Sequence, residues 1–380
     1  FDGARVWGDW IAGFAPYAGA PRVPPAAILY TSGTTGHPKA VRKPTMAPDQ
    51  LATFRQFIFE SYGIGPGARC LVLGPLYHAS PDAAGRAAVN DADIAVLQPK
   101  FDAEDVLRLI ETHKITHIST VPTVFVRLLK LPQEVRERYD VSSLRKVTHT
   151  GGPCPVEVKK QMIDWFGPVI YEIYGGTEQG ISFACDSETW LRHPGTVGMP
   201  LNGTRFAIIG ESGERLGPNE VGEIYARNAA FGDFDYVGRP DSRAECEIDG
   251  LITLGDVGYV NDDGALFLCD RKKDMVISGG VNIYPAETEM ALLTHPGVQD
   301  CAVFGIPDDE MGETLMAAVQ LKPGETLAEE ALRGWLKERM TGYKVPRHVV
   351  FHDSLPREDS GKIFKRKLRA PYWADRESAI

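Results

Sequence analysis

Short apolar segments alternate with segments of helical periodicity between residues 26 and 173, and this alternation limits the fold more than any other feature of the chain. Two of the intervening segments carry apolar residues at helical spacing, and Asp102 precedes one of them as a candidate N-cap. Strands that alternate with helices are typical of a parallel α/β sheet. We expect strands at residues 28–30, 71–73, 94–97, 115–121 and 169–173.

The pattern changes at about residue 195 and again after Lys273. Short β runs with turn signals predict a β-rich subdomain at about 195–269. The C-terminal segment has a compact α+β pattern, in which Pro285 opens one helix and Thr326 with Glu329 forms the capping box of another. We therefore expect a large α/β domain at residues 1–269, a hinge at 270–273 and a small α+β domain at 274–380.

A run of hydroxyl residues, glycines and one lysine at residues 30–39 follows the apolar segment 26–29. Glycines let backbone N–H groups approach phosphate oxygens, hydroxyl groups add donors, and Lys39 adds positive charge. The run is not a Walker loop, because only two residues separate Gly33 from Gly36 and His37-Pro38 precedes Lys39. An exposed turn has the same composition, and the run alone does not decide between the two interpretations.

Composition disfavours several classes of protein. A net charge of −10 works against nonspecific binding to nucleic acid or to anionic membranes. We find no apolar stretch long enough to span a bilayer and no signal-peptide pattern at the start. The six cysteines lack paired metal spacing, so we expect reduced thiols in a cytoplasmic protein.

Four further segments join the run at 30–39 and together cover nearly the whole chain: Tyr174-Gly175-Gly176-Thr177-Glu178, Thr253-Leu254-Gly255-Asp256, Asp270-Arg271-Lys272-Lys273 and Ser360-Gly361-Lys362. In order and spacing the set resembles the acyl-adenylate-forming superfamily, of the acyl-CoA synthetase or aryl-CoA ligase type. In that family a substantial segment precedes the phosphate run, whereas only 29 residues stand before Tyr30 here and the first residue is Phe1. The resemblance therefore implies that an N-terminal part is missing.

The resemblance also implies roles for individual residues. Thr177 would donate to the α-phosphate, and Glu178 would hold Mg²⁺, which prefers oxygen ligands. Gly279 and Gly280 would line the tunnel for the pantetheine of coenzyme A. The nucleotide would be held by Thr31, Ser32, Gly33, Thr34, Thr35, Gly36 and Lys39 at the phosphates, by Gly151, Gly152, Tyr174 and Gly175 beside the adenine, by Asp256 and Arg271 at the ribose, and by Asn282.

Lys362 is the expected catalytic lysine, since in the family the lysine after Ser-Gly bridges the carboxylate and the α-phosphate. It would stabilise charge that develops as pyrophosphate departs. The small domain would then rotate about a hinge at Lys273, which withdraws Lys362 so that the CoA thiolate attacks the adenylate.

The acyl group is expected to lie near His78, Ile173 and Gly175. Peptide-synthetase adenylation domains carry an aspartate at the position of His78, so its absence argues against an α-amino acid. Ile173 is equally consistent with a core residue of a buried strand, and His78 with a packed histidine. In short-chain synthetases a bulky side chain at the position of Gly175 closes the acyl pocket. Glycine here implies room for a longer or aromatic acyl group. His113 and His117 are spaced for a metal, but the residues between them predict a helix that runs into a strand, and we reject a zinc site.

The sequence thus predicts an AMP-forming acid:CoA ligase that uses ATP, Mg²⁺ and coenzyme A. The acid is expected to be a medium- or long-chain fatty, aromatic or steroid-side-chain acid. Another acceptor, such as a carrier-protein thiol or oxygen as in luciferase, stays open, as does a nucleotide-binding pseudoenzyme. We expect no nucleic-acid partner and no transmembrane segment, and leave a homodimer open.

Overall fold

The computed structural model describes residues 12–20, 28–31, 39–357 and 363–374 of the chain. A five-stranded parallel region lies at one end of a 12-stranded sheet, and each of its strands except the last is followed by at least one helix. This confirms the predicted α/β class. The parallel strands run in the spatial order β4 (Ile94–Leu97), β3 (Arg69–Val72), β5 (His117–Thr120), β6 (Lys146–His149) and β7 (Ile170–Gly176).

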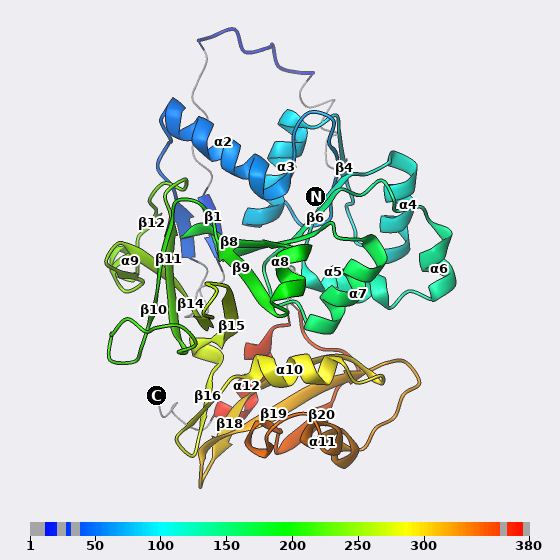
Figure 1. The fold of residues 1–380 in the computed structure, drawn as a ribbon, viewed down its shortest axis with the longest axis vertical. Helices are drawn as coiled ribbons and strands as arrows, with labels where there is room; N and C mark the ends of the chain where they lie inside the picture. Colours follow the sequence, from blue (N-terminus) through cyan, green and yellow to red (C-terminus); the bar gives the residue numbers. More distant parts are fainter. Residues whose placement is uncertain (1–11, 21–27, 32–38, 358–362, 375–380) are drawn as a thin grey trace.

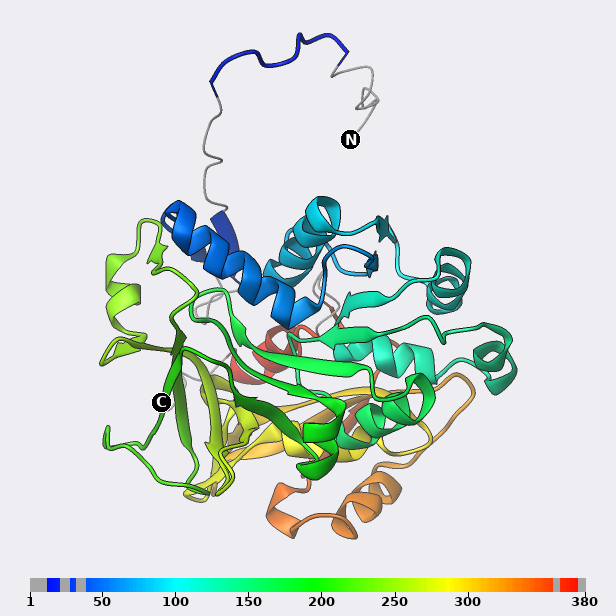
Figure 2. The same ribbon diagram turned by 45° about the horizontal axis from the view of Figure 1, so that its top comes forward.

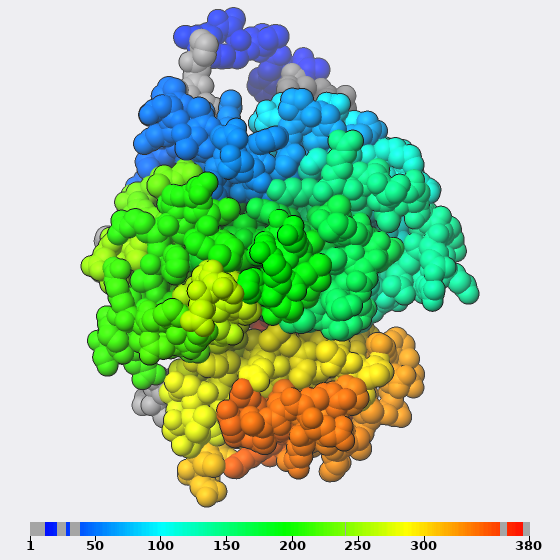
Figure 3. Space-filling model, in the orientation of Figure 1, coloured from blue at the N-terminus to red at the C-terminus, as the bar shows by residue number. Residues whose placement is uncertain are grey.

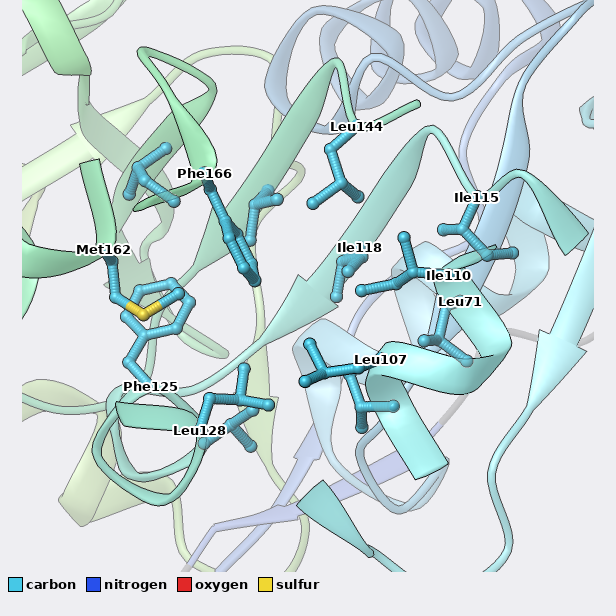
Figure 4. Close-up of a cluster of buried hydrophobic side chains, with 14 of the residues drawn as sticks. Leu71, Leu107, Ile110, Ile115, Ile118, Phe125, Leu128, Leu144, Met162 and Phe166 are labelled. Carbon is cyan, nitrogen blue, oxygen red and sulfur yellow. The ribbon is translucent and has the colours of Figure 1, made fainter. Parts of the chain in front are cut away.

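Helices cover both faces of the parallel region, as Figure 1 and Figure 2 show. On one face, Phe125 and Met162 are among the buried side chains that fill the space between helices and strands (Figure 4). On the other, Tyr62 packs near Ile173. The first face carries α4 (Ala103–His113), α5 (Pro122–Leu129), α6 (Gln133–Arg138) and α7 (Val156–Phe166), with α8 (Ser187–Arg192) following β8, and the second carries α2 (Pro48–Tyr62) and α3 (Ala79–Asp91).

Asp102 caps α4 as predicted, because its carboxylate accepts a 2.8 Å hydrogen bond from the backbone N–H of Asp105. His113 ends α4 and His117 begins β5, so the two histidines lie on different elements.

The β-rich region at about 195–269 continues the sheet of the parallel region. Strand β8 pairs with β7 and with β9, and β9 pairs with β15, so antiparallel strands extend the parallel region into one continuous sheet. The added strands are β8 (Gly180–Asp186), β9 (Thr196–Pro200), β10 (Thr204–Ile209), β11 (Gly222–Asn228), β13 (Glu247–Ile248), β14 (Leu251–Val260) and β15 (Leu266–Arg271).

Strand β1 (Ile28–Thr31) pairs with β2 (Lys39–Arg42) and not with the parallel strands. The short strand β12 (Asp235–Tyr236), which precedes α9 (Pro240–Ala244), pairs with the other edge of β2. The predicted strand therefore exists, but it belongs to a small antiparallel sheet. This sheet brings Thr31 opposite Lys39 and places Tyr236 opposite Val41.

The C-terminal unit, residues 276–374, follows the short 3-10 turn η1 (Lys272–Asp274) and forms the lower layer in Figure 3. Its five-stranded sheet has its own buried core, which includes Leu332 and Leu336. Its elements are β16 (Val276–Ser278), β17 (Val281–Ile283), α10 (Pro285–Leu293), β18 (Val298–Asp308), β19 (Gly312–Leu321), α11 (Glu329–Lys337), η2 (Gly342–Lys344), β20 (His348–Phe351) and α12 (Lys365–Trp373).

Pro285 opens α10 as predicted, but the predicted capping box of α11 is wrong. The N-cap of α11 is Ala328, without a side-chain cap, and Glu329 is the first helical residue. The burial of Leu332 and Leu336 against the C-terminal sheet fixes where this helix lies. None of the helices in the described part of the chain is long and apolar enough to cross a bilayer.

Candidate active site

A cleft of about 3010 Å³ runs between the 12-stranded sheet, the β1–β2 hairpin and the C-terminal unit. Its walls contain many of the residues that the sequence motifs singled out. These are Lys39, His78, Gly151, Gly152, Ile173, Tyr174, Gly175, Thr177, Glu178, Asp256, Arg271 and Lys273. Residues that lie far apart in the sequence thus face one shared space.

Tyr174, Asp256 and Arg271 form a connected group at one wall of the cleft. The Tyr174 hydroxyl donates to Asp256 Oδ2 at 2.9 Å, and Arg271 Nε lies 3.3 Å from Asp256 Oδ1. Pairing of β14 with β15 sets Asp256 opposite Arg271. Burial and the neighbouring Asp256 carboxylate raise the pKa of the Tyr174 phenol well above its usual value, so the phenol stays protonated and can act as a donor.

Glu178, Lys39 and Tyr236 form a second group, which combines three segments distant in sequence. The Tyr236 hydroxyl donates to Glu178 Oε1 at 2.9 Å, and Lys39 Nζ lies 4.7 Å from the centre of the Tyr236 ring. Sequence reasoning missed Tyr236, because 58 residues separate it from Glu178 and no motif surrounds it. In such a cleft the carboxylate can bind Mg²⁺, and the neighbouring lysine can bind a phosphate group.

Lys43 is a further cation on the cleft wall that sequence reasoning missed. Its Nζ lies 5.0 Å from the centre of the Phe231 ring, which in turn packs edge-on against Phe54 and Phe57. Burial lowers the pKa of Lys43 to about 8, although the Glu178 carboxylate partly offsets this effect. The charge of this lysine therefore depends on pH in the range where enzymes are commonly assayed.

Gly175 is required by the close approach of two strands. A Cβ atom at this position would lie 2.0 Å from the carbonyl oxygen of Gly180 in β8. The backbone of β7 shifts register at this point, between Tyr174 and Gly175. The close approach of β8 therefore explains why this position has no side chain. That Gly175 leaves extra room for the acyl group stays a prediction.

The acyl-binding candidates lie on another wall. Ile173 is only 3% exposed and belongs to the buried cluster with Ile58 and Tyr62, yet it also lines the cleft. His78 is the N-cap residue of α3, and its ring centre lies 4.6 Å from that of Tyr77. The cleft at this wall is bordered by the Tyr62 hydroxyl, which lies 2.9 Å from Ser80 Oγ.

Several predicted residues are not placed in the cleft. Ser32, Gly33, Thr34, Thr35, Gly36 and Lys362 lie outside the described residues, between or beside described segments. Among the described residues, the cleft wall does not include Thr31, Gly279, Gly280 or Asn282. The Asn282 amide instead donates to Glu211 Oε1 at 3.3 Å, and the Gly279 N–H donates to the Met311 carbonyl at 2.8 Å.

A buried ionic cluster supports the strand that carries Tyr174. Lys159 of α7 is fully buried, and its Nζ lies 2.6 Å from Glu172 Oε2 in β7. His149 Nε2 lies 3.6 Å from the same oxygen. Burial lowers the pKa of Lys159, but the Glu172 carboxylate, together with Cys185 and Cys154, raises it above its usual value. The lysine thus stays charged, and sequence reasoning did not anticipate this pair.

The chain belongs to the family of AMP-binding enzymes. The family model named AMP-binding enzyme matches residues 15–231. The family model named AMP-binding enzyme C-terminal domain matches residues 287–362. This confirms the family inferred from the motifs.

Similar proteins agree with this assignment. The chain is 35% identical to a long-chain-fatty-acid–CoA ligase of Bacillus subtilis over 90% of its own length, and it spans 61% of that relative. It is 36% identical to a feruloyl-CoA synthase of Amycolatopsis, with 90% of this chain and 69% of the relative covered. Among solved structures, o-succinylbenzoate CoA synthetase from Bacillus subtilis, in complex with an acyl-adenylate intermediate, matches with a TM-score of 0.78 and 30% identity, over 93% of this chain and 70% of that one.

Proposed function

We propose that this chain carries the active site of an AMP-forming acid:CoA ligase. The enzyme would convert a carboxylic acid and ATP to an acyl-adenylate and pyrophosphate, and would then transfer the acyl group to coenzyme A. The observation that carries the proposal is the convergence of Lys39, Tyr174, Glu178, Asp256 and Arg271 on one cleft. A pseudoenzyme would have no need to retain cationic, carboxylate and aromatic groups in this arrangement.

In the first half-reaction the chain would act by positioning and charge. The Asp256 carboxylate would accept the ribose hydroxyls with Arg271 beside it, and the Tyr174 ring would stack on adenine. Lys39 would bind the phosphates, and Thr177 would donate to the α-phosphate. Glu178 would hold Mg²⁺, because its second oxygen can serve as a ligand while the Tyr236 hydroxyl orients the first.

Lys362 would then bridge the carboxylate and the α-phosphate, and would stabilise the charge that develops as pyrophosphate leaves. The described residues just after it, Ile363 and Phe364, line the cleft, which supports this role. We further propose a large domain at 1–269, a hinge at 270–273 centred on Lys273, and a small mobile domain at 274–380. Rotation about the hinge would bring Gly279, Gly280 and Asn282 to the cleft for the second half-reaction.

The acid would be a medium- or long-chain fatty, aromatic or steroid-side-chain acid. Ile173 gives this wall an apolar side chain, and His78 stands where amino-acid-activating domains carry an aspartate. Both features support an acid that lacks an α-ammonium group. The six cysteines are free thiols, which is consistent with the cytoplasmic location that we propose. An acceptor other than coenzyme A, such as a carrier-protein thiol, is the alternative.

The test is to measure pyrophosphate release from ATP with a panel of straight-chain, branched and aromatic carboxylates, and to follow CoA thiol consumption in parallel. We expect Lys362→Ala to lower adenylation by at least about 10²–10³-fold, as is typical of losing an electrostatic contact in the transition state. Thioester formation from a supplied acyl-adenylate should persist. Exposed Lys367→Ala on α12 is the matched control. Equal loss of both half-reactions would remove the proposed role of Lys362, and pyrophosphate release without CoA consumption would favour another acceptor.

A further inference from the structure

Asp270 connects the sheet that carries the nucleotide site to the C-terminal unit. It lies in β15 opposite Val257 of β14, one residue before Arg271. Its Oδ2 accepts a 2.7 Å hydrogen bond from the backbone N–H of Ala286, and its Oδ1 accepts one of 2.7 Å from the N–H of Arg271. Ala286 is in the first turn of α10, where backbone N–H groups have no partner within the helix. One carboxylate therefore caps a helix across the junction between the two parts.

The same face of α10 makes a second connection. Glu289 lies three residues after Ala286, so the two positions share one face of the helix. Glu289 Oε1 accepts a hydrogen bond from the Val303 N–H at 2.7 Å, and Lys365 Nζ lies 2.7 Å from the same oxygen. Lys365 is the first residue of α12, three positions after Lys362. One face of helix α10 thus contacts both β15 and the start of α12.

Lys365 is the cation that the carboxylates of Asp270, Asp274 and Glu289 share at this junction. Burial raises the pKa of the Asp270 carboxyl, and Lys365 and the two backbone N–H donors offset part of this effect. Burial would lower the pKa of Lys365, but Glu289, Asp270 and Asp274 outweigh it and raise the pKa. The carboxylate of Asp270 is therefore held in place by a neighbouring cation and by the N-terminus of α10.

The orientation stabilised by these contacts is the one suited to the first half-reaction. Ile363, Phe364 and Lys365 line the cleft, whereas Gly279 and Gly280 are not among the described residues of its wall. Rotation about residues 270–273 would carry α10 away from β15, and the hydrogen bond between Asp270 and Ala286 would have to break.

We propose that Asp270 is a positioning residue that favours the orientation seen here and thereby divides activity between the two half-reactions. This inference rests on the proposed function, since it needs an enzyme that carries out two half-reactions in two orientations. Asp270 lines the cleft, but the role proposed here acts through its hydrogen bond to α10. Loss of its carboxylate frees the C-terminal unit to leave the cleft, so adenylation slows while transfer to the thiol does not.

The experiment compares Asp270→Ala and Asp270→Asn with wild type in separate assays of the two half-reactions. Asp270→Ala should lower kcat for pyrophosphate release by about tenfold or more, the factor that corresponds to losing one hydrogen bond to a charged group. Its KM for ATP should change little, and thioester formation from a supplied acyl-adenylate should be equal to wild type or faster. Asp270→Asn keeps one acceptor oxygen, so its effect should be smaller. Glu287→Gln is the control. Glu287 lies in the same turn of α10, but its carboxylate pairs with Lys344 inside the C-terminal unit.

A second measurement does not depend on activity. Lys272 and Lys273 are exposed, so limited trypsin digestion at 25 °C should cut Asp270→Ala at these residues faster than wild type or Glu287→Gln, at equal thermal stability. Parallel loss of both half-reactions, or unchanged half-reactions and cleavage, would overturn the proposal. If wild type releases no pyrophosphate with any acid, the proposed function fails, and the cleavage rates then decide by themselves whether Asp270 holds the junction.

Discussion

At the scale of single residues, Asp256 is shared between two partners. One oxygen accepts from Tyr174 and the other faces Arg271, so the carboxylate is oriented before any nucleotide is present. Preorganisation of this kind lowers the cost of binding, because the side chain does not have to be ordered by the ligand. A ribose would meet a carboxylate already aimed by a phenol from β7 and a guanidinium from β15.

Lys43 leads to a prediction about pH. Burial lowers its pKa from the usual 10.5 to about 8 in the folded chain, so the folded state disfavours the charged form. Between these two values the unfolded chain holds the proton and the folded chain has lost it, and stability attributable to Lys43 therefore rises with pH across this window. Below about 8 the cost of burying the charge is fully present.

Lys43→Met should remove this cost. We expect the variant to gain about 1–3 kcal/mol in free energy of unfolding relative to wild type at pH 7, and the gain should shrink as pH rises from about 8 to 10.5. Urea unfolding at a series of pH values would measure the free energy of unfolding of both proteins. The difference between variant and wild type at each pH cancels the titration of groups that the two proteins share. A gain that does not change with pH would mean that Lys43 is not the source.

At the scale of secondary-structure elements, the Lys159–Glu172 pair fixes α7 against β7. Lys159→Met leaves the Glu172 carboxylate buried without its cation, and we expect a loss of about 3–5 kcal/mol in free energy of unfolding. The double variant Lys159→Met/Glu172→Gln should lose clearly less, because no unpaired charge remains buried. Lys160→Met is the control on the same helix, since its ion pair with Asp164 is exposed and should contribute less than about 1 kcal/mol. Equal losses for Lys159→Met and Lys160→Met in urea unfolding would contradict this account.

Local sequence rules predicted the elements where the decisive contacts are local. Asp102 caps α4 because the hydrogen bond spans three residues, and the same kind of rule failed at Thr326 because burial of Leu332 and Leu336 decided where α11 lies. Short motifs singled out Tyr174, Glu178 and Asp256, which face one cleft in the structure, because each stands within a recognisable local segment. Tyr236 and Lys159 could not be found this way, since their roles arise from pairing of β12 with β2 and from packing of α7 under the sheet.

At the scale of the whole molecule, the 12-stranded sheet carries Tyr174, Asp256 and Arg271, and a separate five-stranded sheet forms the C-terminal unit. The chain passes between them through η1, where Lys272 pairs with Glu223 and Lys273 is exposed. A short turn can absorb a large change in backbone angles more easily than a strand or a buried helix can.

Lys273→Pro should restrict that turn. Proline fixes its own φ near −65° and restricts the preceding residue, so we expect the chain to keep one orientation. Adenylation should persist, while thioester formation should fall sharply. Lys273→Ala serves as the control, because it removes the same charge and leaves the backbone free. If overall CoA ligation by Lys273→Pro stays near wild type, the hinge lies elsewhere.

Strand β4 ends the order of described strands in the 12-stranded sheet, and its pattern of burial leaves Leu97 51% exposed. An edge strand with an apolar side chain offers backbone N–H and C=O groups to strands of other molecules, and among the described strands β4 pairs only with β3. The net charge of −10 opposes such contacts between copies by repulsion. Salt screens that repulsion, so the colloidal stability of the purified chain is set by ionic strength as well as by temperature, and dilute buffers of low salt are the conditions in which its solutions should stay clear.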